Sequence, residues 1–294
     1  MIHKPVLIKE VLKYLNPKPN ENFIDATIGQ GGHAVEILKQ NGPDGLLLGI
    51  DLDSKQIENS RALTEKFKKR IILVNDSYVN LKYIIEKENF RPVMGILLDL
   101  GMSSWQLEKS GRGFTFQKNE VLDMRYNMQN MLTAGKIINE YPEKEIEKIL
   151  RDSGEEKFAK HIAKKIAKSR KEKKIQSTFE LKNIIAKALP VKFHHGKIHF
   201  ATRTFQALRI TVNQELDNLK EVLPKTLEVL AGDGRLVVIS FHSLEDRIVK
   251  DFFKSKEEKG LIKIITKKPI MALESEILNN PRSRSAKLRA IVKV

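Results

Sequence analysis

Strand and helix patterns alternate through the first hundred residues of the chain, and this alternation restricts the fold more than any other feature. Short apolar runs that end at polar or glycine residues predict strands at 22–27, 46–51, 70–75 and 94–100. The segments between them predict helices near 32–40, 54–68 and 77–88. Such a rhythm is typical of a doubly wound, mostly parallel sheet, so we expect a Rossmann-like α/β fold.

The alternation stops near residue 107, and the next strand of similar quality is at 234–241. Between them, EKEIEKIL, KFAKHIAKKIAK and FELKNIIAKAL show the i, i+4 apolar spacing of amphipathic helices. We therefore predict one discontinuous α/β domain made of 1–106 and 204–294, interrupted by an all-helical domain at 107–203.

The chain after this insertion returns to the α/β pattern. A long helix is predicted over 205–230, with an interruption at Pro224 because proline lacks the N–H that a helix interior needs. The remaining elements are predicted as a helix at 243–254 and strands near 261–266 and 287–294.

The segment DATIGQGGHA, residues 25–34, is the most informative loop. Gly29, Gly31 and Ala34 satisfy the G-x-G-x-x-A spacing of dinucleotide-binding loops, which alone favours a nicotinamide or flavin cofactor. Asp25, however, would repel a pyrophosphate at a cost on the order of a few kcal/mol. The same carboxylate suits S-adenosylmethionine, which carries an ammonium and a sulfonium, and D-x-x-x-G-x-G loops are used by class I methyltransferases.

Two further acids stand at predicted strand ends. Asp51, about 20 residues after the glycines, is suited to bind ribose hydroxyls of either cofactor type, while Asp53 is suited to cap the next helix. Asp99 ends the fourth strand, where ligands of parallel sheets bind; a turn residue is the alternative. Tyr78, after the third strand, is suited either to flank an adenine or to pack in the core.

The composition is that of a globular protein with a strongly basic surface. The chain has 294 residues, 41% of them hydrophobic and 31% charged, and a formal net charge of +16. This excess of Lys and Arg indicates nucleic acid as a partner, although a lysine-rich solvated surface gives the same charge. No membrane-spanning or signal-peptide pattern is found, so we expect a cytoplasmic protein that does not contact membranes.

The chain has no cysteine, which excludes several reaction classes. Disulfides, thiolate metal sites and iron–sulfur clusters cannot form. Methylation of cytosine C5 is excluded too, because it needs a thiolate that attacks the ring. An exocyclic nitrogen or a ribose oxygen is left as the methyl acceptor, and such a transfer needs no metal.

Eight sequence blocks together resemble one family. They are HKPVL near the start, GQGGH at 29–33, LLDLGMSSWQL at 97–107, RGFTF at 112–116, LDMR at 122–125, ATRTFQALRI at 201–210, SFHSLEDR at 240–247 and NPRSRSAKLR at 280–289. In this order, over nearly the whole chain, they resemble the bacterial methyltransferases of cytosine N4 in small-subunit (16S) ribosomal RNA, the MraW family.

The resemblance implies an S-adenosylmethionine-dependent enzyme that methylates N4 of a cytidine in the P-site decoding region of 16S rRNA within the small subunit. By position, it implies the following cofactor contacts: Gly31, Gly32, His33, Asp51, Tyr78, Asp99 and Gln106.

Two residues are candidates for catalysis. The cytosine amino group is a poor nucleophile, so an acceptor for its N–H and accurate positioning would do most of the work. Asp99 is suited to that role or to binding the methionine ammonium. His242 is suited to act near the transferred methyl, held by a capping box of Ser243 and Asp246, or to serve only the structure. We predict no metal at His194, His195 and His199.

Basic residues predict where RNA would bind. Residues 157–174 hold nine Lys or Arg against one Glu, and the segment near the C-terminus adds an arginine pair in a loop that we expect to be flexible. Phosphate contact is predicted for Lys160, Lys164, Lys165, Lys168, Arg282 and Arg284. A solvated helix face is the alternative.

Other functions remain open at this point. G-x-G-x-x-A alone supports an NAD(P)-binding oxidoreductase, and the fold alone supports a non-catalytic RNA-binding assembly factor. The oligomeric state is also left open, a homodimer included.

Overall fold

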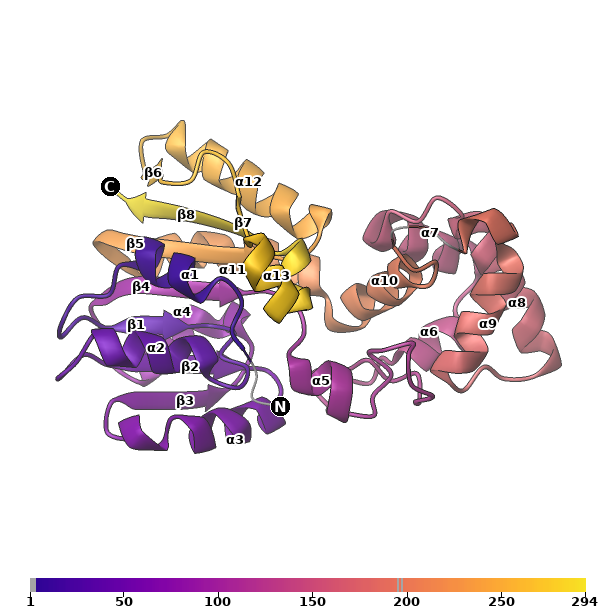
Figure 1. Ribbon diagram of the computed structural model, residues 1–294, viewed down its shortest axis with the longest axis horizontal. Coiled ribbons are helices and arrows are strands. Elements are labelled where there is room, and N and C mark those ends of the chain that lie inside the picture. Colours follow the sequence, from indigo (N-terminus) through magenta and orange to yellow (C-terminus); the bar gives the residue numbers. More distant parts are fainter. Residues whose placement is uncertain (1–3, 195, 197) are drawn as a thin grey trace. The chain divides into compact units, whose positions relative to one another are not determined.

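The computed structural model describes residues 4–194, 196 and 198–294 (Figure 1). The chain forms two compact units, which we call the sheet unit (Met1–Gly101 with Leu216–Val294) and the helical unit (Met102–Glu215). The helix over Thr202–Asn213, which the sequence placed in the α/β domain, belongs to the helical unit.

The sheet unit is built on one mostly parallel sheet of eight strands. They are β1 (Phe23–Asp25), β2 (Leu47–Asp51), β3 (Ile71–Asn75), β4 (Val93–Asp99), β5 (Leu230–Ser240), β6 (Ile262–Ile264), β7 (Ile270–Met271) and β8 (Lys287–Lys293). The order is β3-β2-β1-β4-β5-β8-β6, with β7 paired to β8. Strands β1 to β5 are parallel to one another, whereas β8 is antiparallel to each of its neighbours β5, β6 and β7. The expected Rossmann-like fold is confirmed.

The strand order reverses direction between β1 and β4. Asp25 of β1 is paired in register with Gly49 of β2 on one side and with Leu97 of β4 on the other. In open α/β sheets, the crossovers leave a crevice at this switch point, outside the carboxyl ends of the strands. The fold therefore predicts a ligand site where β1 and β4 end, and we call this edge of the sheet the crevice.

Helices cover both faces of this sheet. They are α1 (Ile8–Leu15), α2 (Gly32–Gln40), α3 (Ser54–Leu63), α4 (Leu81–Lys87), α11 (Glu215–Val229) and α12 (Ser243–Glu257). A further helix of this unit, α13 (Glu274–Asn279), has no buried residue. Side chains of α4, α11 and α12 pack with Ile24 and Leu98 in one core. Side chains of α1, α2 and α3 pack with Phe23 and Leu97 in another. Neighbouring residues of a strand thus enter opposite cores, as its period of two requires.

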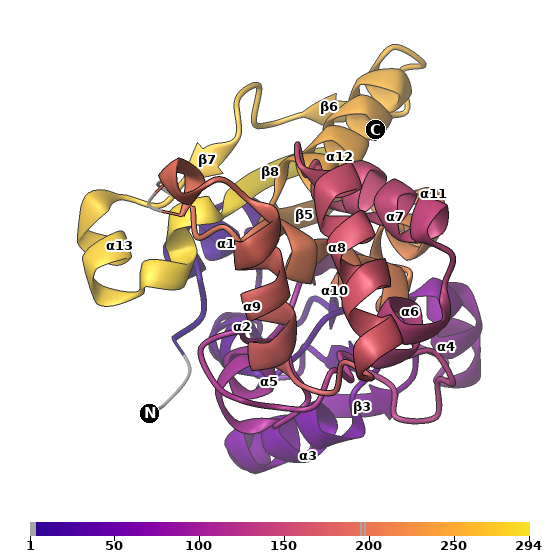
Figure 2. The same cartoon turned by 90° about the vertical axis from the view of Figure 1, so that its right-hand side faces the viewer.

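In its described residues, the helical unit contains six α-helices, a short 3₁₀ helix over Val191–Phe193 and a long loop. The helices are α5 (Ser104–Lys109), α6 (Ala134–Glu140), α7 (Glu143–Gly154), α8 (Ala159–Glu172), α9 (Thr178–Ala188) and α10 (Thr202–Asn213). Figure 2 shows α8 and α9 side by side, and both contribute to one apolar core. Arg170 of α8 donates hydrogen bonds to the carbonyls of Ile138 and Tyr141, which ties α8 to the end of α6.

The predicted helix over 205–230 is two helices, and its break is not at Pro224. Gln214 separates α10 from α11 with φ of 52°, and α11 continues through Pro224. The break has a local cause, because the side chain of Asn213 donates to the Met124 carbonyl and accepts from the Tyr126 N–H. These bonds fasten the loop before α6 to the end of α10.

None of the described helices combines the length and apolar character that crossing a bilayer requires.

Close contact between β1 and β4 requires glycine at position 95. A Cβ there would lie 2.7 Å from Phe23 Cδ1 and 2.9 Å from Leu15 Cδ1, both in fully buried side chains. We expect Gly95→Ala to lower the free energy of unfolding by about 1–3 kcal/mol, as overpacking does.

Gly232→Ala is the matched control for this prediction, because a Cβ at Gly232 would meet nothing within 4 Å. It should change stability by less than about 1 kcal/mol. Urea unfolding followed by circular dichroism measures both, and equal stabilities of the two variants would contradict the prediction.

Candidate active site

Three carboxylates end three neighbouring strands at the ligand crevice. Asp51, Asp25 and Asp99 are the last residues of β2, β1 and β4, which lie next to one another in the sheet. Because these strands are parallel, their carboxyl ends share one edge. Asp25 is almost enclosed at 1% exposure, whereas Asp51 and Asp99 are partly exposed. Asp51 and Asp99 can therefore contact a ligand, and Asp25 acts on it by charge.

Backbone amides fix the carboxylate of Asp51. Its Oδ2 accepts a hydrogen bond from the Gly29 N–H at 2.9 Å, and its Oδ1 accepts one from the Asp53 N–H at 2.9 Å. Gly29 has φ of +53°, a conformation that glycine adopts at little cost. Asp53 caps α3 through the Lys55 N–H, as predicted. The glycine loop therefore positions the acid that the sequence assigned to the ribose.

Asp99 has a buried oxygen without a hydrogen-bond partner among the described residues. That atom is Oδ1, while Oδ2 lies 3.6 Å from His33 Nδ1. His33 Nε2 lies 2.9 Å from the Val6 carbonyl, which can only accept, so Nε2 carries a proton. The Asp99 backbone N–H donates to Thr27 Oγ1 at 2.7 Å. The backbone of Asp99 is thus anchored by Thr27, whereas its carboxyl group is left incompletely bonded.

Burial makes all three carboxyl groups reluctant to ionise. It raises the pKa of Asp25 to about 7 and that of Asp51 to about 7. The pKa of Asp99 is raised well above its usual range, first by burial and then by the charges of Asp25 and Glu245. A cation in the crevice would oppose these effects, because it favours the charged form of each acid. The residues present fit a cationic ligand and would repel a pyrophosphate.

Packing explains the next two glycines of the loop. A Cβ on Gly31 would lie 3.3 Å from Ser60 Cβ and from Thr64 Cγ2 of α3, and φ at Gly31 is +87°. A Cβ on Gly32 would lie 3.2 Å from Pro5. The two glycines therefore let the start of α2 approach Pro5 and the end of α3 closely. Their predicted role in cofactor binding stays a prediction.

Tyr78 and Gln106, which are also predicted to contact the cofactor, lie outside the glycine loop and outside the strands that carry the acids. Tyr78 begins a short 3₁₀ helix just beyond β3, at the same edge as the acids, and its ring is half-buried against the core. Gln106 belongs to the helical unit, where it closes a capping box with Ser103 at the start of α5. Its Oε1 accepts from the Ser103 N–H at 2.8 Å.

His242 caps a helix, and the predicted capping box of Ser243 and Asp246 is wrong. Its Nδ1 accepts the Glu245 N–H of α12 at 3.4 Å, so His242, and not Ser243, is the N-cap. Its Nε2 lies 3.2 Å from Glu245 Oε1. Glu245 Oε2 in turn accepts the Phe241 N–H at 2.8 Å. Asp246 instead pairs with Arg289 at 2.6 Å.

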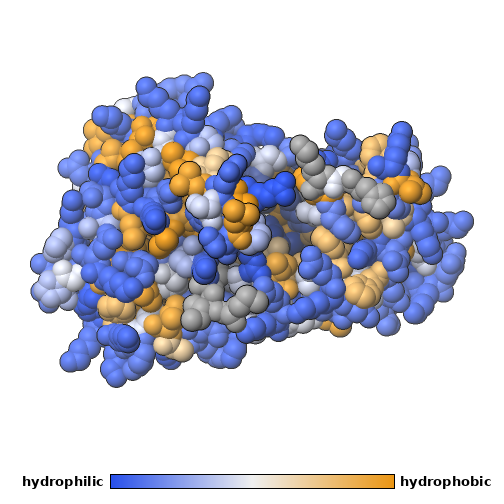
Figure 3. All heavy atoms as spheres, viewed as in Figure 1, coloured by the Kyte–Doolittle hydropathy of each residue, from blue (hydrophilic) through white to orange (hydrophobic). Residues whose placement is uncertain are grey.

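The predicted RNA-binding residues are found on two surfaces. On α8 of the helical unit, Lys160, Lys164 and Lys168 are exposed and Lys165 is half-buried. Figure 3 shows that hydrophilic side chains cover much of the face it displays. In the sheet unit, Arg284 is exposed and Arg282 is half-buried.

The segment around Arg282 and Arg284 is structured, contrary to the flexible loop that was expected. It forms a 3₁₀ helix over Pro281–Ser285, in which Ser283 is fully buried and its hydroxyl donates to the Asn280 carbonyl. The Asn280 side chain donates to the Lys4 carbonyl, which fastens this helix to the start of the chain.

Of the histidines excluded as metal ligands, His195 lies outside the described residues. His194 Nε2 lies 3.1 Å from the Ala186 carbonyl. His199 stacks on Phe116 at 4.4 Å and on Phe200 at 4.2 Å between ring centroids. Burial lowers its pKa, helped by the charge of Lys182.

The fold and the crevice define a Rossmann-like enzyme for a cationic nucleoside cofactor, the class of S-adenosylmethionine-dependent methyltransferases. The family model described as the MraW methylase family matches residues 1–294. The chain therefore belongs to the MraW methylase family, and it uses S-adenosylmethionine.

Several relatives match this chain along its length. A Sulfurihydrogenibium protein is 47% identical over 287 residues, which cover 98% of this chain and 97% of that protein. Relatives from Heliobacterium mobile and Thermotoga neapolitana are each 44% identical, over 308 and 291 residues, and cover 99% and 98% of this chain, and 99% and 95% of their own length. All three are named ribosomal RNA small subunit methyltransferase H.

The raised pKa of Asp25 predicts a pH-dependent stability of the protein without cofactor. An acid whose pKa rises from 3.8 to about 7 on folding stabilises the fold while it is protonated, below pH 4. That contribution is lost as the pH rises through 7. We expect Asp25→Asn to become more stable than the wild type by a few kcal/mol, at most about 4, between pH 4 and pH 8.

Urea unfolding at a series of pH values measures this difference. Asp44→Asn, in an exposed turn, is the control and should follow the wild type. A constant difference between Asp25→Asn and the wild type from pH 4 to pH 8 would refute the linkage.

Proposed function

We propose that the chain transfers a methyl group from S-adenosylmethionine to N4 of a cytidine in the P-site decoding region of 16S rRNA. The substrate would be rRNA within the small ribosomal subunit, and the reaction would take place in the cytoplasm without a metal. The family assignment and the relatives' names support this proposal. The single structural observation that carries it is the row of acids, Asp51, Asp25 and Asp99, along the crevice.

The acids have separate tasks in this proposal. Bound S-adenosylmethionine supplies an electrophilic methyl group on a sulfonium. Asp51, oriented by two backbone N–H groups, accepts hydrogen bonds from the ribose hydroxyls with its remaining lone pairs. Asp25 is almost fully buried and adds negative charge without taking up ligand space. Burial keeps these charges effective, because water screens them little.

Asp99 is the acid with bonding capacity to spare. Its unpaired Oδ1 can accept one N–H, from the methionine ammonium or from the cytosine amino group. We assign Asp99 to this position, where an ionised carboxylate would either hold the ammonium or orient the amino nitrogen. His242 would then be a positioning residue, because its Nδ1 is used in capping α12 beside the crevice strand β5.

The helical unit would contact the RNA. Its α8 presents the exposed Lys160, Lys164 and Lys168 on the side opposite its buried isoleucines. These lysines follow one another at intervals of four residues, a spacing that suits consecutive phosphates. Arg170 is excluded from this group, because its guanidinium is committed to the carbonyls at the end of α6.

Methyl transfer to purified small subunits tests the proposal. Subunits from a strain that lacks this enzyme would be incubated with the full chain and tritiated S-adenosylmethionine. Mass spectrometry of the rRNA digest should then find N4-methylcytidine at one site. No methylation of any nucleotide would favour a non-catalytic RNA-binding factor. Calorimetric binding of NAD without a response to S-adenosylmethionine would favour an oxidoreductase.

Asp99→Asn tests the acid with the free oxygen. It keeps the shape of the group but removes the charge, so we expect cofactor affinity or turnover to fall by about 10²–10⁴-fold. Calorimetry and single-turnover methyl transfer separate the two effects.

Asp76→Asn is the control for this variant. Asp76 follows β3 at the same edge, and its carboxylate accepts hydrogen bonds from Ser77 and Asn80. Its backbone N–H donates to the Asp51 carbonyl, a bond that the substitution leaves in place. Asp99→Asn with unchanged affinity and turnover would remove Asp99 from the mechanism.

A further inference from the structure

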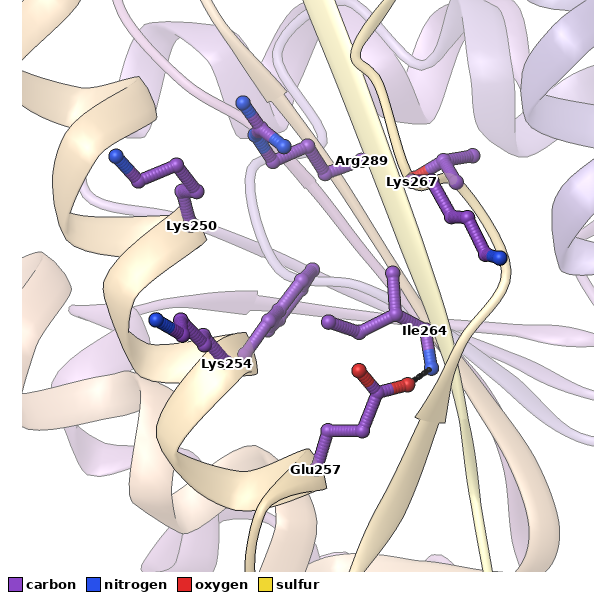
Figure 4. Close-up of a pocket in the computed structure, with 8 residues that line it drawn as sticks. Lys250, Lys254, Glu257, Ile264, Lys267 and Arg289 are labelled. Carbon is purple, nitrogen blue, oxygen red and sulfur yellow. Dashed lines mark hydrogen bonds between the residues drawn. The ribbon is translucent and has the colours of Figure 1, made fainter.

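A basic pocket lies on the sheet unit, on elements that contribute none of the crevice acids. It is formed between α12 and the segment that runs from β6 toward β7, and its volume is about 300 Å³ (Figure 4). The lining residues are Lys250, Phe253, Lys254, Glu257, Ile264, Thr266, Lys267 and Arg289. Four of these side chains are cations and one is an anion, so the pocket attracts anions.

The single acid of the pocket is already committed to the protein. Glu257 Oε1 accepts the backbone N–H of Ile264 at 2.7 Å, a bond that Figure 4 shows across the pocket. Arg289 is likewise paired, with Asp246, and is 9% exposed, so it forms part of the wall. The charges that face solvent are therefore those of the three lysines.

These lysines are available for a ligand. Lys250 lies 3.3 Å from Asp251 and Lys254 lies 3.8 Å from Glu258, but both lysines are more than half exposed. Ion pairs of this kind contribute about 0–1 kcal/mol, so a phosphate can replace them at little cost. Lys267 is exposed, and the described part of the chain offers it no ion pair within 4 Å.

The surrounding sequence extends the positive charge. Residues 250–268 contain seven lysines against three acids, a second basic run besides that of α8. The floor of the pocket is apolar, since Phe253 is buried and Ile264 is half-buried. A rim of flexible ammonium groups over an apolar floor suits a phosphodiester with its attached ribose, and Lys serves phosphates as a point charge.

We propose that this pocket, formed by α12, β6 and the segment after β6, binds the phosphodiester backbone of the rRNA substrate at a position other than the target cytidine. The inference rests on the proposed function, because it takes the ligand to be RNA. It gives the sheet unit its own contact with the substrate, in addition to the lysines of α8 in the helical unit.

A triple variant, Lys250→Gln, Lys254→Gln and Lys267→Gln, tests the pocket. Binding of the full chain to small subunits that lack the modification would be measured as a function of salt concentration. We expect about tenfold weaker binding near 0.15 M salt. The slope of log affinity against log salt should fall by about 2, since each phosphate contact with single-stranded RNA accounts for about 0.7. KM for subunits should rise while kcat and the affinity for S-adenosylmethionine stay unchanged.

The control removes the same charge elsewhere on the sheet unit. Lys66→Gln, Lys69→Gln and Lys87→Gln together change three exposed lysines, two just before β3 and one at the end of α4, and this variant should bind as the wild type does. Equal affinities and slopes for the two triple variants would overturn the inference.

Lysine acetylation read by mass spectrometry adds an independent test. Bound subunits should protect Lys250, Lys254 and Lys267 from acetylation but leave Lys66 exposed. Unprotected pocket lysines in a saturated complex would also overturn the inference. A wild-type chain that binds subunits but methylates nothing would refute the proposed function instead, and the comparison of the two variants would still decide the pocket.

Discussion

The enclosure of negative charge at one edge of the sheet is the constraint on which the site depends. Three acids end adjacent strands, and folding removes most of the water that would solvate them. Their raised pKa values show that the fold alone does not compensate this loss. Without a ligand the acids are compensated by protonation, whereas a bound cation would favour their charged forms. The crevice therefore selects ligands by their charge, in addition to any selection by shape.

The glycine loop takes its meaning from this charge. In a dinucleotide-binding fold, such a loop brings backbone N–H groups to a pyrophosphate. Here the N–H of Gly29 is used to hold Asp51, and Gly31 allows α2 to approach α3. The same spacing of glycines thus occurs in loops that bind an anionic cofactor and in loops that bind a cationic one. The acid at Asp25 is the residue that distinguishes the two kinds of loop.

Sequence predicted the sheet and its row of acids because parallel strands must end on one side. Asp51 and Asp99 could be placed on that edge from the strand pattern alone. The pairing of His33 with Asp99 could not, because it depends on how α2 is oriented by the Val6 carbonyl. The cap at His242 was missed since Ser243 is the more usual capping residue, and only the backbone shows which one precedes the helix.

The protein must attract two ligands of opposite charge without confusing them. The chain's net charge of +16 attracts RNA to the protein surface, whereas the three acids of the sheet unit repel phosphates. Both ligands can be attracted because the electrostatic field of the exposed lysines and that of the buried acids differ in range and in the medium through which they act. The lysines act through solvent over about a Debye length, whereas the buried acids act only on what enters the crevice. In the proposed mechanism, the RNA backbone would stay outside for this reason, while a neutral base would still reach the edge at which the acids end the strands.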